Sequence, residues 1–519
     1  MRNDAEFPAR GHAGETELVP GRPRKLILIE PKPPGYHIFS KSKLPRLGTV
    51  LLGAIARDLG WEVRIYVEDI APIDYRDAIN ADVVGVSTIT TTATRAYAVA
   101  DGLRKFGVPV VIGGPHVTFL PEEALAHSDY VVRGEGEAAF PALLRAIRWG
   151  GRVDDVPNLS WRDEGGVVRH NPLAPAIEDL DSLPYPDFNL IVGWRQAKSF
   201  GRLPIIPVQT SRGCPYGCSF CSVIPMFGRK YRFRSVENIL GELERYADQP
   251  HYVFFYDDNF TANRDRTKEL LTRAAQKPGV LTKWSAQVRV ETANDEELLA
   301  LMHKTGCSTV YIGFESANPQ ALQEMHKHQT VDQMRQSVRR FADHAIDIHG
   351  MFVLGLDCDT REAIAGTIRF AKKNDILSSQ FIILTPFPGT PVYEDMKAQG
   401  RLTNSDWSLY DGHHVVFQPK NLTLWDLQKA QMKGHSQFYS VLRTLKQFLS
   451  GYFIGAALYV YARHVIRKWM RGNRGYLKAL KQIGRKRNIQ PDSGFARVAD
   501  DVGRKIAAAA TAAGMLSSS

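Results

Sequence analysis

The chain has 519 residues and a formal net charge of +11, with 66 Lys and Arg, 55 Asp and Glu, and five cysteines. Its length exceeds the roughly 250 to 300 residues that one hydrophobic core serves, which argues against a single domain and predicts at least two. The small, odd number of cysteines argues against a disulfide framework and predicts a reducing, cytoplasmic location.

The N-terminal part of the chain alternates strand and helix patterns after a polar leader. Residues 1–24 are rich in Pro and Gly and lack the apolar core of a signal peptide, so we expect a disordered leader. In the first domain, residues 25–150, strands are predicted at 25–30, 62–67, 82–87, 109–113 and 130–133, with helices at 47–59, 94–106 and 121–126. This alternation predicts an α/β fold with a doubly wound parallel sheet, which binds ligands at the carboxyl ends of its strands.

Candidate ligand contacts follow three of these strands. Glycines in the segments GGPHVT and RGEGE let the backbone approach a bulky flat ligand closely. The candidate residues are Ser87, Thr88, Gly113, Gly114, His116, Gly134, Glu135 and Gly136.

A connector at 151–202 precedes a second α/β domain at 203–400. Its predicted strands are 205–209, 252–256, 284–288, 309–314, 349–354 and 380–384, with helices between them. Six strand-helix units predict a partial barrel, and the active sites of barrels lie at the carboxyl ends of the strands.

Three cysteines directly follow the first strand of the second domain. Cys214, Cys218 and Cys221 stand in the segment TSRGCPYGCSFCSV, whereas Cys307 and Cys358 are solitary. Three thiolates on one loop leave the fourth iron of a 4Fe-4S cluster open for chemistry, and the spacing differs from the usual zinc and ferredoxin patterns. A three-cysteine zinc site or three buried thiols is the alternative.

This C-x3-C-x-aromatic-C pattern, with Phe220 as the aromatic residue, resembles the signature of radical S-adenosylmethionine (SAM) enzymes. The resemblance implies that the open iron binds SAM. One electron from a donor such as flavodoxin or ferredoxin then cleaves SAM to a 5'-deoxyadenosyl radical. It also implies SAM contacts, in strand order, at Phe220, Asp257, Asp258, Asn259, Gln287, Arg289, Glu315 and Ser316.

Each implied SAM contact has a chemical reason and an alternative. Oxygens at 257–259 suit the SAM ammonium, although one of them is expected to cap the next helix. Arg289 suits the SAM carboxylate, although a surface ion pair is the alternative. Glu315 can accept hydrogen bonds from both ribose hydroxyls.

The first domain resembles the cobalamin-binding domain that precedes the barrel in one large subfamily of radical SAM enzymes. The chain departs from many cobalamin proteins after its first strand, where it reads EPKPPGYHIFS and contains no Asp-x-His motif. We therefore expect cobalamin without a histidine ligand to cobalt, with His116 hydrogen-bonded instead. The alternative is a flavodoxin-like sheet without a ligand.

Residues 401–519 are expected to be a basic, mostly helical region with a disordered tail. Between Asp426 and Asp492 there are fourteen Lys and Arg and no acidic residue. Phe448 to Ala462 is an apolar stretch of 15 residues, shorter than the roughly 20 that span a bilayer. We expect an interfacial helix at the inner face of a membrane, with the side chains of Tyr452, Phe453, Leu458 and Tyr461 buried in it. A solvated basic face is the alternative, and nucleic-acid binding is less favoured.

The resemblances together predict a cobalamin-dependent radical SAM methyltransferase that methylates an unactivated carbon of an apolar or lipid-like small molecule. Oxidative cyclisation or rearrangement of a tetrapyrrole-like substrate is a close alternative. A radical transfer-RNA-modifying enzyme is a further one. Methylthiotransferases of that kind carry a second three-cysteine cluster domain, for which only two cysteines remain here.

Overall fold

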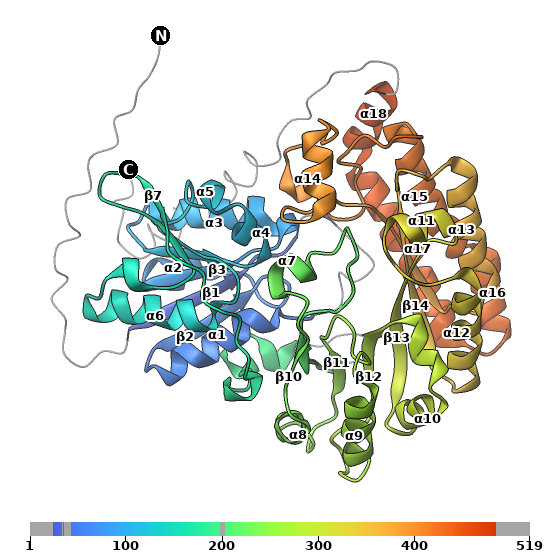
Figure 1. The fold of residues 1–519 in the computed structure, drawn as a ribbon, viewed down its shortest axis with the longest axis horizontal. Helices are drawn as coiled ribbons and strands as arrows, with labels where there is room; N and C mark the ends of the chain where they lie inside the picture. Colours follow the sequence, from blue (N-terminus) through green and yellow to red (C-terminus); the bar gives the residue numbers. More distant parts are fainter. Residues whose placement is uncertain (1–23, 34, 36–42, 198–202, 484–519) are drawn as a thin grey trace.

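The computed structural model describes residues 24–33, 35, 43–197 and 203–483. The expected leader lies outside the described residues except for Arg24, and so does the chain beyond 483. Two α/β units lie side by side, and the C-terminal helices pack on the far side of the second unit (Figure 1).

The first unit is built on a sheet of seven strands in the order β2-β1-β3-β4-β5-β6-β7. Its strands are β1 Lys25–Glu30, β2 Glu62–Val67, β3 Val83–Ser87, β4 Val110–Gly113, β5 Tyr130–Val132, β6 Leu159–Arg162 and β7 Val168–His170. The first five are parallel, and their order is that of flavodoxin-like doubly wound folds. All six residues of β1 are buried, as expected for a strand covered on both faces.

Helices cover both faces of this sheet. They are α1 Leu47–Asp58, α2 Tyr75–Ile79, α3 Ala93–Arg104, α4 Pro115–Phe119, α5 Pro121–Ala124 and α6 Gly136–Trp149, with the short η1 at Thr90–Thr92. The doubly wound sheet predicted from the sequence is therefore confirmed. The GGPHVT segment differs from the expected loop, because Pro115 begins the short helix α4.

Strands β6 and β7 extend the first sheet into the region that we expected to be a connector. Both are antiparallel to their neighbours. The residues of β7 are half-buried or exposed, so the strand has no buried apolar face that would mark it in the sequence.

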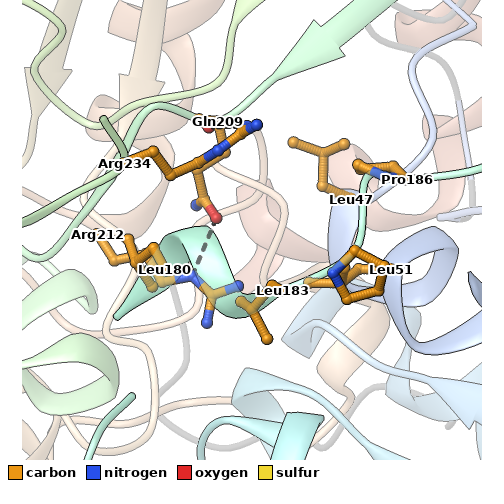
Figure 2. A pocket seen from close by; sticks show the side chains of 10 residues that line it. Leu47, Leu51, Leu180, Leu183, Pro186, Gln209, Arg212 and Arg234 are labelled. Atoms are coloured by element: carbon orange, nitrogen blue, oxygen red, sulfur yellow. Dashed lines mark hydrogen bonds between the residues drawn. The ribbon is translucent and has the colours of Figure 1, made fainter. Parts of the chain in front are cut away.

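The described remainder of the connector has no further long helix or strand. It contains the short turns η2 Val153–Asp155, η3 Leu180–Ser182, η4 Phe188–Leu190 and η5 Trp194–Gln196. Figure 2 shows where it meets both units: a small hollow of about 50 Å³ is lined by Leu51 of α1, Leu183 of the connector and Arg212 of the second unit, among others.

The second unit is a partial barrel of six parallel strands in the order β15-β14-β13-β12-β11-β8. The strands are β8 Ile205–Val208, β11 Tyr252–Phe255, β12 Trp284–Val288, β13 Cys307–Glu315, β14 Asp347–Leu354 and β15 Ser378–Ile383. The helices are α7 Val223–Phe227, α8 Val236–Glu244, α9 Arg264–Ala274, α10 Glu296–Lys304, α11 Pro319–Glu324, α12 Val331–Asp343 and α13 Arg361–Lys373, with η7 at Val290–Asn294. Several start at side-chain caps, such as the capping box of Thr330 and Gln333 on α12.

The C-terminal region is helical. The helix α14 Pro391–Ala398 precedes this region, which comprises η8 Trp407–Leu409, α15 Leu424–Phe438, α16 Val441–Leu449, α17 Phe453–Gly472 and α18 Arg474–Ile483. The expected single helix over 448–462 is instead divided between α16 and α17, because Gly451 has a φ of 74° in the turn that joins them. No helix in the described part of the chain combines the length and apolarity needed to cross a membrane.

Candidate functional site

The three motif cysteines lie on a short loop, residues 213–222, which we call the cysteine loop. Its base is closed by β9 Ser211–Arg212, which pairs antiparallel with β10 Arg232–Phe233. Gly213 has a φ of 89°, and a Cβ atom there would overlap the carbonyl oxygen of Lys230. Only glycine fits where the chain turns this tightly.

The donor set on this loop suits an iron-sulfur cluster. Cys214, Cys218 and Cys221 are half-buried free thiols. Burial raises the pKa of the Cys221 thiol to about 12, so a metal must displace a proton there. Among the described residues, no group of three or more His, Cys, Asp or Glu side chains is arranged to hold a single metal ion. Thiolates that bind separate irons of one cluster need no such arrangement.

The other two cysteines lie elsewhere. Cys307 is buried at the start of β13, at the opposite end of the barrel strands from the cysteine loop. Cys358 follows β14 and accepts a long hydrogen bond of 3.9 Å from the Asn318 amide nitrogen. Neither is part of the cysteine loop.

A cavity of about 400 Å³ separates the strand ends of the first sheet from the cysteine loop. Its first wall includes Ser87, Gly113, Gly114, Gly134, Glu135 and Gly136, which the sequence analysis had singled out. Its second wall comes from the barrel and includes Gln209, Arg212, Ser222, Val223, Met226, Phe227, Tyr256 and Asp258. The topology thus brings the two predicted cofactor regions to one space.

The first wall fits a large ligand that approaches the backbone. Gly114 has a φ of 113°, and a Cβ atom there would overlap the carbonyl oxygen of Thr88. Gly136 would be crowded by Leu52, at 3.3 Å from such a Cβ atom. A side chain at Gly114 would displace the strand ends that form the wall, whereas one at Gly136 would require the Leu52 side chain to move.

Two of the residues predicted to contact cobalamin, Thr88 and His116, do not line the cavity. Thr88 is buried, and its backbone nitrogen and hydroxyl both donate to the Gly113 carbonyl, at 2.8 and 2.9 Å. The His116 ring is buried between Thr90 and Glu123, each 3.4 Å from a ring nitrogen. None of the described residues that line the cavity is a histidine.

Buried ion pairs join the two walls at the base of the cavity. Arg212 lies 2.6 Å from Glu137 and 3.4 Å from Glu135, and Arg232 lies 2.6 Å from Glu135. At most 8% of any of these four side chains is exposed. Burial acts to raise the pKa of Glu135, but the hydrogen bond from Arg232 and the charge of Arg212 lower it overall. Glu135 therefore acts mainly as an anchor between domains.

A second tie between the domains comes from the C-terminal region. The indole nitrogen of Trp407, on η8, donates to Glu123 at 2.8 Å, and the Trp407 ring packs edge-on against His116. The neighbouring Asp406 accepts from the Thr94 hydroxyl at 3.5 Å. The two domains are thus held together at two separate places.

The structure separates the roles of the three polar residues after β11. Asp257 is fully buried and accepts hydrogen bonds from the Thr210 nitrogen, at 3.1 Å, and from the Thr210 and Ser211 hydroxyls. It ties β11 to the start of the cysteine loop, and its carboxylate is already engaged there. Asn259 is also buried, and its carbonyl accepts from Tyr231.

Asp258 is the member of this triplet that lines the cavity. Burial and the neighbouring Asp257 carboxylate raise the pKa of Asp258 to about 7. Gln287, on β12, donates to the Asp257 carbonyl at 3.4 Å.

The remaining SAM candidates form a chain of contacts beside the cysteine loop. The Arg289 guanidinium stacks on Tyr216 of that loop, 3.8 Å from its ring centroid, and pairs with Glu291 at 3.0 Å. It also donates to the carbonyl of Lys327, whose ammonium binds Glu315 at 2.7 Å. Arg289 and Glu315 are thus linked through Lys327. Each already has a partner of opposite charge, which is Glu291 for Arg289 and Lys327 for Glu315.

Two further SAM candidates take structural positions. The Ser316 hydroxyl lies 3.3 Å from the Thr367 hydroxyl and accepts from the Asn318 nitrogen, so it faces α11 and α13. Phe220 is half-buried and packs against the core.

Sequence reasoning missed several residues of the site. Arg46 and Leu47, at the start of α1, line the cavity, and Lys327 binds Glu315. Met226 and Phe227 follow the cysteine motif closely in sequence, and this closeness could have been used to predict that they belong to the site. Lys327 had no local signal, since it meets Glu315 through a turn in which His326 and His328 have φ values of 53° and 47°.

Comparison with known proteins matches both domains to families. The model of the radical SAM superfamily matches residues 208–371, and that of the B12 binding domain matches residues 38–144. The chain is 36% identical over 431 residues to an uncharacterised methyltransferase of Pyrococcus horikoshii, covering 80% of this chain and 92% of that one. It is 30% identical to the bacteriochlorophyllide d C-12(1)-methyltransferase of Chlorobaculum tepidum, covering 77% and 84%.

Two further proteins extend the comparison. The anaerobic magnesium-protoporphyrin IX monomethyl ester cyclase of Cereibacter sphaeroides is 29% identical, with 67% of this chain and 59% of that one covered. The solved structure of the radical SAM methyltransferase TsrM from Kitasatospora setae matches with a TM-score of 0.60 and 20% identity, over 73% of this chain and 75% of that one. The likeness to TsrM shows a shared fold.

The fold and these relationships define the class: the protein is a radical SAM enzyme with an N-terminal cobalamin-binding domain. More particularly, the chain belongs to the family of cobalamin-dependent radical SAM methyltransferases and cyclases. Its cofactors are a 4Fe-4S cluster, SAM and cobalamin. The cysteine loop would hold the cluster, and the walls of the cavity would hold cobalamin.

Proposed function

We propose that this protein is a methyltransferase that moves a methyl group from SAM, by way of cobalamin, to an unactivated carbon of an apolar substrate. The cavity shared by the strand ends of the first sheet and the cysteine loop carries the proposal. When bound, the cluster supplies the electron that cleaves SAM, and cobalamin carries the methyl group. The chain itself holds the two walls at a fixed separation through the pairs of Glu135 and Glu137 with Arg212 and Arg232.

The cavity that would hold cobalamin is itself mostly apolar, so a substrate that meets cobalamin there would contact apolar surface. Most of its side chains are aliphatic or aromatic: Leu28, Leu47, Leu52, Val86, Ile89, Val111, Val132, Phe140, Val223, Met226, Phe227 and Tyr256. Of the charged residues, Glu135, Glu137 and Arg212 are already paired with one another. Such a lining excludes water and favours a ligand with apolar surface. The Chlorobaculum relative, whose name gives a bacteriochlorophyllide as substrate, agrees with this choice.

A second candidate is anaerobic cyclisation of a tetrapyrrole-like substrate, which the cyclase relative favours. Cyclisation and methylation differ in the fate of the SAM methyl group, so one labelling experiment separates them. We propose flavodoxin or ferredoxin as the electron donor for either reaction.

The test uses full-length protein reconstituted without oxygen with iron, sulfide and cobalamin. It is incubated with methyl-labelled SAM, a reductant, and an apolar extract of cells that lack the protein. We expect the label in an apolar product, together with S-adenosylhomocysteine and 5'-deoxyadenosine in equal amounts. A new product without label would instead establish cyclisation, and label in total RNA supplied in a parallel incubation would favour a transfer-RNA enzyme. The Cys218→Ala protein is the control, and it should form no product.

A further inference from the structure

The hairpin formed by α16 and α17 carries a concentrated exposed apolar surface. Within the described part of the chain, twelve large hydrophobic side chains are exposed, and eight of them lie between 441 and 460. Leu442, Leu449 and Ile454 are 77%, 75% and 78% exposed. We call the eight residues the hairpin patch: Val441, Leu442, Leu445, Phe448, Leu449, Phe453, Ile454 and Val460. Contiguous patches of this kind are rare on soluble proteins without a binding role.

The hairpin is fixed to the rest of the protein by polar contacts of α16 and the turn and by the buried side chains of α17, and the hairpin patch stays exposed. Arg443 on α16 donates to the carbonyls of Lys372 and Ile376 and to the Tyr459 hydroxyl, at 3.1 to 3.4 Å. The Tyr452 hydroxyl in the turn donates to Asp347 at the start of β14, at 2.8 Å. No side chain of α16 is buried. The patch is thus presented by a rigid support.

One exposed stripe of α17 continues the patch and changes from apolar to basic along the helix. Residues recur at helical spacing along this stripe: Phe453, Ala457, Val460, His464, Arg467 and Arg471. Exposed lysines and arginines also lie on α16 and α18, at Lys446, Arg474, Lys478 and Lys481. Because the sequence has no acidic residue between Asp426 and Asp492, these charges share one sign.

The exposed apolar and basic side chains of the hairpin together indicate the chemistry of the partner. Apolar side chains beside a basic surface match a bilayer with anionic headgroups. The apolar side chains can be buried between the headgroups and the acyl chains, and the basic side chains are attracted to the anionic headgroups. Neither α16 nor α17 is long and apolar enough to cross a membrane, so the contact is with the surface. Figure 1 shows α16 at the opposite end of the molecule from the first sheet, so the first sheet faces away from a membrane bound at the hairpin.

We propose that the α16–α17 hairpin seats this protein on an anionic membrane surface, with the tip at residues 448–454 inserted among the lipids. The proposal stands independently of methyl transfer. It also corrects the sequence-based expectation, in which Tyr452, Leu458 and Tyr461 were to enter the membrane. The structure leaves these three half-buried, with Phe453 exposed as expected.

The test is cosedimentation of the reconstituted full-length protein with vesicles of phosphatidylcholine alone or with added phosphatidylglycerol, at low and high salt. The patch variant combines Leu442→Ser, Leu449→Ser and Ile454→Ser, all at exposed positions. The matched control combines Trp149→Ser and Leu173→Ser, which are 62% and 65% exposed but lie outside the hairpin. A charge variant combines Lys446→Gln, Arg467→Gln and Arg471→Gln.

We expect the parent and the control to bind anionic vesicles and to be released by salt. The patch variant should bind at least about tenfold more weakly, and the charge variant should lose the preference for anionic lipid. Equal binding of parent and patch variant would overturn the proposal. It would also be overturned if the parent self-associates without lipid in sedimentation velocity and the patch variant does not, because the hairpin patch would then be an interface between copies.

Discussion

Arg212 and Glu137 form an ion pair of 2.6 Å between the barrel and the first domain, although they are 75 positions apart in sequence. Arg212 stands two residues before the first cysteine of the cysteine loop, and Glu137 lies in the first turn of α6. The segment that would carry the cluster is therefore attached directly to the domain that would carry cobalamin.

Replacing Arg212 should weaken the joint between the domains. In Arg212→Met, Glu137 loses its partner while buried, and breaking such a pair costs about 3–5 kcal/mol. The midpoint of thermal unfolding should fall accordingly. Lys230→Met is the matched control, because Lys230 pairs with Glu178 at a site where the side chains are 71% and 61% exposed. That change should cost about 0–1 kcal/mol, and similar losses in both variants would contradict the anchoring role.

The same joint should make stability depend on pH. The folded-state pKa of Glu135 lies below its ordinary value of 4.5, because Arg232 and Arg212 outweigh the effect of burial. A lowered folded pKa adds stability above the unfolded pKa, and this contribution is lost as the pH falls through the folded pKa. Denaturant titrations from pH 7 into the acid range should therefore show a loss of stability below pH 4.5 that is smaller in Glu135→Gln. Parallel curves for both proteins would contradict this assignment.

Iron content should depend on three of the five cysteines. We expect about four irons per reconstituted chain, and Cys214→Ala, Cys218→Ala or Cys221→Ala should abolish SAM cleavage. Cys307→Ala and Cys358→Ala serve as controls and should keep both iron and cleavage, since neither residue is part of the cysteine loop. SAM cleavage at the parent rate by the Cys214→Ala protein would show that the cluster lies elsewhere.

Cobalamin uptake should depend on Gly114. A Cβ atom there would overlap Thr88 and displace the cavity wall, so Gly114→Ala should bind hydroxocobalamin much more weakly. Gly107→Ala is the control, since Gly107 also has a positive φ, of 77°, but a Cβ atom at that position would meet no neighbour within 4 Å. The absorption spectrum of bound cobalamin should be of the base-off type and unchanged in His116→Ala, because His116 is engaged by Thr90 and Glu123. A changed spectrum in His116→Ala would identify it as a cobalt ligand.

Asp257 and Asp258 should respond differently to the same substitution. Asp257→Asn removes an acceptor from the Thr210 and Ser211 donors and should cost about 1–3 kcal/mol of stability. Asp258→Asn should leave the unfolding midpoint nearly unchanged and alter SAM binding in equilibrium dialysis, because Asp258 lines the cavity. The opposite pattern would restore Asp257 as the SAM contact.

Sequence patterns predicted the two sheets well because buried parallel strands are continuous apolar runs, as in Lys25–Glu30. The cysteine loop was also predictable, since its ligands are adjacent in the chain. The roles of Glu135 and Asp257 were not, because their partners Arg232 and Thr210 are set by tertiary packing. Strand β7 was missed because none of its residues is buried.

The two domains are joined at two separate places, and this restricts which domains of related proteins can be combined in one chain. A chimaera that joins this first domain to the barrel of a relative must match residues on both sides of the seam, at Glu135, Glu137 and Glu123 and at their partners Arg232, Arg212 and Trp407. A junction placed in the connector alone would leave Glu135 and Glu137 buried without arginine partners wherever the barrel of the relative lacks them. The two domains are thus exchangeable only together with their shared joint.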